Sequence, residues 1–208
     1  MDDVWPMVHA ERAALLADLE SLEDSQWQRD SLCAGWTVHD VAAHLVDTAL
    51  TTRVGFMLGL ARARFDFDRQ NDRGVERHRG ATPRQTLTRL REVATRTSTP
   101  PGSLDSRIVE EVVHGEDIRR PLGLVRAYPA AAVDRALLYQ TRTSAAMGGA
   151  KDRVAGLRLE ATDHDLLHGD GALVRGTALD LLLAVSGRQS ALADLTGPGV
   201  SRLAQTPA

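Results

Sequence analysis

Two side chains able to bind a metal ion stand four residues apart in the segment RIVEEVVHGEDIRRP. They are Glu110 and His114. A helix would place them about 40° apart on one face, where a carboxylate and an imidazole can converge on one cation. Arg107 shares this face one turn earlier. A buried carboxylate or histidine is costly unless it is paired or metal-bound, which favours a ligand pair. The same spacing also occurs by chance on exposed helices.

His44, in the segment GWTVHDVAAHLVDTAL, is a candidate third ligand. A single histidine on one face of a helix is usually a core or surface residue whose ring nitrogens have hydrogen-bond partners. Metal sites in helical bundles, however, are built from helices that each present ligands inward. His44, Glu110 and His114 would then form a site with positions open for water or substrate. Two histidines and a carboxylate also hold the iron of non-haem oxygenases, so these ligand types leave the metal open.

Four other polar residues could support or replace these three as ligands. Asp117 lies one turn after His114 and either orients that imidazole as a hydrogen-bond acceptor or pairs with a neighbouring arginine. Cys33 precedes a helix start, where a thiolate is favoured, and could be a nucleophile. Because no base is adjacent in the sequence, we expect its side chain to have a packing role instead. His164 and His168 form a second H-x-x-x-H pattern, in a turn-rich segment where the argument from a helix face does not apply.

Three further residues are candidates for contact with a substrate. Arg175 in LVRG is suited to an anionic substrate, because a guanidinium binds carboxylates in a planar fork; its alternative is a surface ion pair. Asn71 and Arg73 would stand on a long loop at a pocket mouth.

The elements that must position these residues follow from apolar spacing and from breakers. Thr37 and Asp40 make a variant of the capping box at a helix start. The predicted segments are helices over 4–22, 37 to about 64, 83–98, 104–120 and 129–147, a loop over 66–83, a strand from 157, and a helix over 177–185. The fold class is therefore mainly α: a helical bundle over residues 1–150, followed by a small α+β domain over 151–208.

Composition narrows the functional classes. The chain has 208 residues, 43% of them hydrophobic, and a net charge of −3 with both signs interspersed, which gives no footprint for nucleic acid. One cysteine cannot form an internal disulfide and fits a reducing compartment. The start of the chain has no cationic region before an apolar run, and no apolar run is long enough to span a membrane. We therefore expect a cytoplasmic protein without a membrane partner.

The segment DSQWQRDSLCAGWTVHDVAAHLVD resembles the N-terminal domain of the mycothiol-dependent maleylpyruvate isomerase family, a branch of the DinB-like helical bundles. That family has a tryptophan, a C-x-G-W-T-x-x-D helix start and a His-Leu pair. The matching residues here are Trp27, Cys33, Gly35, Trp36, Thr37, Asp40, His44 and Leu45. A later E-x-x-x-H-x-x-D pattern is matched by Glu110, His114 and Asp117. Residues 156–188 also resemble the small domain that follows the bundle in this family.

The resemblance implies a DinB-like up-down bundle with one divalent metal, usually zinc, on His44, Glu110 and His114. It also implies mycothiol as co-substrate, with a metal-activated thiolate adding to an electrophile, as in a cis/trans isomerase or an S-transferase. A metal-dependent hydrolase on the same bundle and a non-catalytic metal- or ligand-binding module are the alternatives. The partners would be a small-molecule thiol and an electrophilic substrate. The oligomeric state stays open, with a homodimer as one option.

Overall fold

The computed structural model describes residues 3–205, which divide into two compact units. The first unit ends at Arg126 and the second begins at Ala127. The predicted mainly α class is confirmed, with a small three-stranded sheet confined to the second unit. The division lies earlier than the predicted boundary near residue 150, because the helix that begins at Ala130 packs against a helix of the second unit. Each unit is described by itself.

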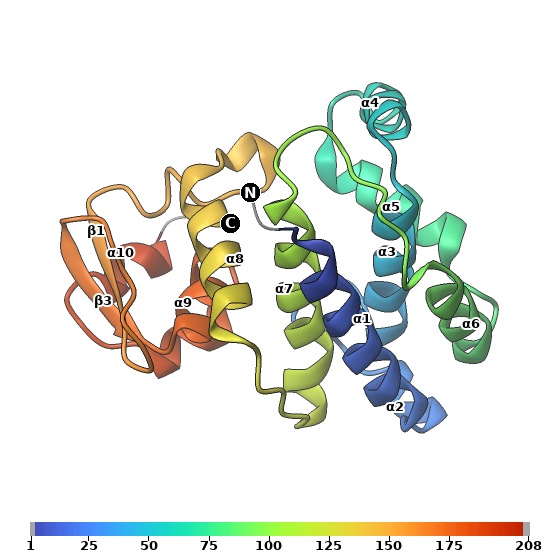
Figure 1. Cartoon of the computed structure of the whole chain (residues 1–208), viewed down its shortest axis with the longest axis horizontal. Helices are drawn as coiled ribbons and strands as arrows, with labels where there is room; N and C mark the ends of the chain where they lie inside the picture. Colours follow the sequence, from blue (N-terminus) through green and yellow to red (C-terminus); the bar gives the residue numbers. More distant parts are fainter. Residues whose placement is uncertain (1–2, 206–208) are drawn as a thin grey trace. The chain divides into compact units, whose positions relative to one another are not determined.

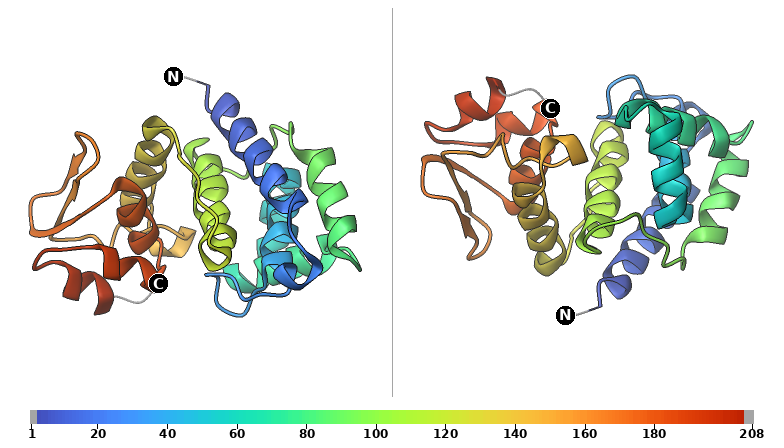
Figure 2. Two further views of the ribbon diagram at one scale, coloured as in Figure 1. Left: turned by 90° about the horizontal axis from the view of Figure 1, so that it is seen from below. Right: turned by 90° about the horizontal axis from the view of Figure 1, so that it is seen from above.

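The first unit is a helical bundle around one central helix, α3 (Figures 1 and 2). Helices α5, α6 and α7 all pack against α3, while α1 packs against α6 and α7. A core of aliphatic side chains and Trp27 fills the space between them. The helices are α1 (Trp5–Glu20), α2 (Asp24–Trp27), α3 (Val38–Leu50), α4 (Arg53–Arg62), α5 (Phe67–His78), α6 (Pro83–Val93) and α7 (Asp105–Leu122).

The capping box predicted at the start of α3 is confirmed. The Thr37 side chain accepts a hydrogen bond from the Asp40 backbone N–H, and the Asp40 carboxylate accepts one from the Thr37 backbone N–H. The prediction of one helix to about residue 64 is wrong. The chain turns extended at Thr51 and Thr52, and Thr52 caps a new helix by accepting from the backbone N–H of Gly55. The starts of α3 and α4 thus each have a side chain that satisfies an orphan N–H group.

The loop predicted over 66–83 is also wrong, because most of it is the helix α5. Asp66 begins this helix by accepting from the Arg69 backbone N–H. Only Gly74 and Val75 are buried in α5. A Cβ built on Gly74 would lie 2.5 Å from Oδ2 of Asp47, so glycine permits the close approach of α5 to α3.

The second unit combines helices with a small sheet of order β2-β1-β3. Strand β1 pairs antiparallel with β2 and parallel with β3. Helix α9, fully apolar except for Asp180, packs on α8, β1 and β3. None of the helices over residues 3–205 combines the length and apolar character needed to cross a membrane. The elements are α8 (Ala130–Arg142), η1 (Ala145–Met147), β1 (Leu157–Ala161), β2 (Leu167–His168), β3 (Ala172–Gly176), α9 (Ala178–Val185), η2 (Gln189–Asp194) and α10 (Val200–Gln205).

Candidate metal centre

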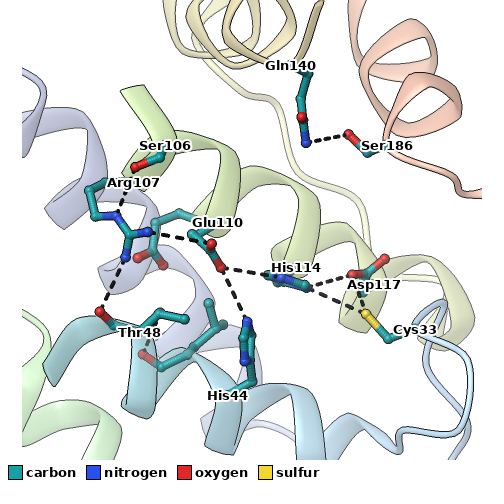
Figure 3. A network of polar contacts seen from close by, with 12 residues as sticks. Cys33, His44, Thr48, Ser106, Arg107, Glu110, His114, Asp117, Gln140 and Ser186 are labelled. Carbon is teal, nitrogen blue, oxygen red and sulfur yellow. Dashed lines mark hydrogen bonds and ion pairs between the residues drawn. The ribbon is translucent and has the colours of Figure 1, made fainter. Parts of the chain in front are cut away.

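The structure brings His44 of α3 together with Glu110 and His114 of α7 (Figure 3). Oε2 of Glu110 lies 3.4 Å from Nε2 of His44 and 3.4 Å from Nε2 of His114. The two imidazole rings meet edge to face, with centroids 4.7 Å apart. The three side chains therefore point one donor atom each into a single small space.

The ligand helix α7 continues past the residue where it was predicted to stop. Pro121 lies inside its last turn, and the helix ends at Gly123, which adopts the left-handed conformation (φ 70°). A proline has no N–H, so it leaves the carbonyl four residues earlier, that of Asp117, without its helical donor. The backbone N–H of Leu32 donates to this carbonyl at 3.1 Å instead. The loop before α3 is thereby fixed to the end of α7, beside His114.

The two carboxylate oxygens of Glu110 have different neighbours. Oε1 lies 3.6 Å from Nη2 of Arg107, a buried arginine whose Nη1 donates to the carbonyl of Thr48 on α3. Oε2, which faces the two histidines, is buried and has no hydrogen-bond partner among the described residues. Its close polar neighbours are the two ring nitrogens, each 3.4 Å away. A buried carboxylate is costly unless it is paired, and a cation held between the three groups would satisfy its charge.

The donor set fits a divalent metal. Ligand atoms about 2.0–2.1 Å from a tetrahedral ion stand about 3.3–3.4 Å apart. The two separations of 3.4 Å between Glu110 and the histidines match that spacing. Two imidazoles and one carboxylate are also the protein ligands of catalytic zinc sites that keep a position for water or substrate. His44, Glu110 and His114 are therefore the residues that would hold the ion.

Asp117 and Cys33 line the other side of the His114 ring. Oδ2 of Asp117, which is fully buried, lies 2.8 Å from Nδ1 of His114, so the ring N–H can donate to it. The Cys33 thiol donates to the same oxygen at 3.0 Å and lies 3.6 Å from Nδ1. A carboxylate on Nδ1 fixes the tautomer that leaves Nε2 with its lone pair for a metal. The structure shows the contact between Asp117 and His114 that the first of the two predicted alternatives requires.

Cys33, His114 and Asp117 also form a group that could hold a cation by themselves. Their atoms, however, are already joined by a hydrogen bond from the thiol and by the close contact of imidazole and carboxylate. We therefore assign this group to orienting His114. The sequence prediction that Cys33 packs structurally did not anticipate its contact with the site.

Burial and neighbouring charges shift the three candidate ligands in different directions. Burial lowers the pKa of His44 more than the neighbouring Glu110 raises it. Burial acts in the same direction on His114, but Cys33 and Asp117 outweigh it and raise the pKa of His114 well above its usual value. Burial acts to raise the pKa of Glu110, but the two histidines hold it well below its usual value. Glu110 is thus held as the anion that a cation requires.

Trp36 forms one wall of the site. Its ring centroid lies 5.0 Å from that of His44, and its indole N–H donates to Asp72 of α5. From the sequence, Trp36 is predicted only to lie at the start of a helix. Its position one residue before the N-cap of the helix that carries His44 was the available signal.

The remaining candidates lie elsewhere. His164 contacts Asp134 of α8 at 2.6 Å, and no group of three potential ligands forms around it or His168 in the described part of the chain. Arg175 of β3 contacts Glu160 at 3.2 Å and is about half exposed. Its predicted role in binding a substrate stays a prediction.

These features define a helical bundle with a His, Glu, His candidate metal centre between two helices. The profile of the mycothiol maleylpyruvate isomerase N-terminal domain matches residues 8–119, more than half of the chain, and includes all three candidate ligands. The chain therefore belongs to this family.

Two solved structures share the fold. They are crystal structures of the mycothiol-dependent maleylpyruvate isomerase and of a mutant of it in which one histidine is replaced by alanine. Each has a TM-score of 0.64 and 15% sequence identity, covering 93% of this chain and 91% of that chain. At this identity the likeness concerns the fold. No curated protein sequence matches the chain.

Proposed function

We propose that the chain is a metal-dependent enzyme that uses a low-molecular-weight thiol such as mycothiol, with one divalent ion on His44, Glu110 and His114. The ligand types suit zinc and iron alike, and we propose zinc because it is the metal that the family resemblance implies. The observation that carries the proposal is the buried Oε2 of Glu110, which lies between two imidazole nitrogens and has no hydrogen-bond partner among the described residues. Family membership and the shared fold support the thiol chemistry.

A bound zinc ion would lower the pKa of a coordinating thiol, so that it reacts as a thiolate near neutral pH. The protein's contribution is positioning. Asp117 accepts from Nδ1 of His114 and orients that ring, while Arg107 beside Oε1 keeps the Glu110 carboxylate charged. The Trp36 ring shields one side of His44 from water.

The reaction we propose is addition of the thiolate to an activated double bond. Rotation about the resulting single bond and expulsion of the thiol give an isomerase; retention of the adduct gives an S-transferase. We place this chemistry in the cytoplasm, with a small electrophile as the second substrate.

Metal analysis of purified variants tests the site. Elemental analysis of the wild-type protein should give about one ion per chain, and His44→Ala and His114→Ala should lose most of it. His168→Ala, a histidine outside the site, is the matched control and should keep the metal. Circular dichroism checks that each variant is folded. If His44→Ala and His114→Ala bind as much metal as the control, the site assignment is wrong.

Thiol consumption tests the reaction. Metal-loaded protein is incubated with mycothiol and with maleylpyruvate or other activated alkenes, and thiol and product are followed together. Product formed only in the presence of the thiol supports the proposal. Turnover without the thiol would identify a hydrolase, and binding without turnover a non-catalytic module; either result would overturn it.

A further inference from the structure

A cavity of about 380 Å³ lies between the end of α3 and the helices α4 and α5. This volume falls within the usual range of small-molecule sites, about 300–1,000 Å³. None of the three candidate metal ligands lines the cavity. Asp47, which does line it, stands one turn after His44 on α3, so the cavity neighbours the candidate metal centre along that helix.

The lining is strongly cationic although the whole chain carries a net charge of −3. Asp47 is its one carboxylate, and the cationic or titratable side chains are Arg62, Arg73, Arg77 and His78. Oδ1 of Asp47 lies 3.5 Å from Arg77 and 3.3 Å from His78. This single carboxylate is therefore shared between two of the four side chains.

Arg73 donates to the backbone carbonyl of Arg62, which leaves the charge of Arg73 without a counterion there. The guanidinium of Arg62 has no hydrogen-bond or ion-pair partner within residues 3–205. An anion is therefore the charge that this cavity favours.

Two further features restrict the anion. Gln70 lines the cavity, and its amide oxygen is buried and lacks a hydrogen-bond partner in the described chain. A rotation of the amide toward the cavity would let this oxygen accept from a hydroxyl group of a ligand. Leu50, Phe56 and Leu58 supply apolar surface to the lining. An inorganic anion would use neither feature and would fill little of the volume.

We propose that this cavity binds a small organic anion with a hydroxyl group and an apolar body, the class of the aromatic hydroxy acids. Its carboxylate would meet Arg62 and Arg73, its hydroxyl would donate to Gln70, and its apolar part would lie against Phe56. The site goes beyond the proposed function because it requires neither the metal nor the thiol.

Isothermal titration with three related compounds tests the proposal. Mandelate carries the carboxylate, the hydroxyl and an aromatic ring; phenylacetate lacks the hydroxyl, and mandelamide lacks the charge. Mandelate should bind at least about tenfold more tightly than either, since losing one charged or buried hydrogen bond costs about 1.4 kcal/mol or more. No saturable binding of mandelate, or equal binding of mandelamide, overturns the proposal.

Variants locate the binding. Arg62→Gln should weaken mandelate binding about tenfold, and Gln70→Leu should remove the preference over phenylacetate. Arg69→Gln is the matched control, because Arg69 is an exposed arginine of α5 outside the lining, and it should bind like the wild type. Urea unfolding checks that all three variants are folded. Binding unchanged in Arg62→Gln would overturn the proposal.

Titration of metal-free protein separates this site from the metal centre. Mandelate should bind equally well before and after treatment with a chelator. Loss of binding on chelation would place mandelate at the metal centre and overturn the proposal. Persistence of binding in a protein that fails the thiol assay would uphold the cavity while rejecting the proposed function.

Discussion

Arg12 of α1 and Glu111 of α7 form an ion pair inside the helical unit, and removing one partner should strongly destabilise the protein. Nε of Arg12 lies 2.7 Å from Oε1 of Glu111, and both side chains are at most 2% exposed. Arg12 also donates to the backbone carbonyls of Ala94 and Arg96 at the end of α6. The pair thus links three helices, one of which carries two of the candidate metal ligands.

The magnitude follows from burial. Glu111→Gln keeps the shape of the side chain but leaves the charge of Arg12 unpaired in the core, which costs about 3–5 kcal/mol. An exposed pair, Arg91 with Glu20, has a similar contact of 2.9 Å with side chains 47% and 48% exposed. Glu20→Gln should cost only about 0.2–1 kcal/mol. The two substitutions differ chiefly in burial, so each controls for the other.

Urea unfolding followed by circular dichroism measures both values. The double variant Arg12→Met/Glu111→Leu should recover most of the loss, because it removes both charges and their desolvation cost together. The carbonyl of Arg96 can then bond to water, since that residue is exposed. If Glu111→Gln loses no more stability than Glu20→Gln, the reasoning from burial is refuted.

Three shorter predictions concern the helices around the site. Burial lowers the pKa of His39 to about 4, so stability should be full above about pH 6.5 and fall by about 3 kcal/mol as the pH drops toward 4; His39→Gln should lack this slope in urea unfolding. Thr37→Ala should cost about 1–2 kcal/mol by removing the cap of α3, whereas Thr37→Ser should unfold like the wild type. Gly74→Ala should cost about 1–3 kcal/mol because its methyl group would displace Asp47, while Gly59→Ala, which meets only a flexible side chain, should be neutral or stabilising in the same assay.

Local signals in the sequence were sufficient for several elements. The start of α3 was predictable because Thr37 and Asp40 satisfy each other's backbone within one turn. Strand β1 was predictable because Leu157 and Leu159 alternate with polar residues, and both are buried. In each case the information lies within a few neighbouring residues.

Helix α5 was not predictable in this way. Its apolar content is low. It packs closely on α3 because Gly74 has no side chain, and the need for a glycine there becomes visible only once Asp47 of α3 is placed beside it. The break between α3 and α4 has a similar cause. The spacing of apolar residues allows one helix to continue through Thr51 and Thr52. The new helix begins there because the Thr52 side chain accepts a hydrogen bond from the backbone N–H of Gly55.

The residues of the candidate site also differ in whether local sequence signals could identify them. Glu110 and His114 were linked by helix spacing together with resemblance to a family. His44 came mainly from that resemblance, because only the fold brings α3 to α7. Their juxtaposition is shown, and their role as metal ligands stays a prediction. Of the residues that line the cavity beside Asp47, only Arg73 was predicted to lie at a pocket. It was predicted on a loop and lies on α5.

The neighbourhood of His114 shows why a local rule can mislead at a functional site. The predicted end of this helix at residue 120 rests on Pro121, which lacks an N–H group. The structure retains the helix because Leu32, nearly ninety residues earlier in the chain, donates to the carbonyl that Pro121 leaves without a donor. That bond also fixes the loop that carries Cys33, whose thiol donates to the carboxylate that orients His114. One missing hydrogen-bond donor therefore connects the end of the ligand helix to the support of a candidate ligand.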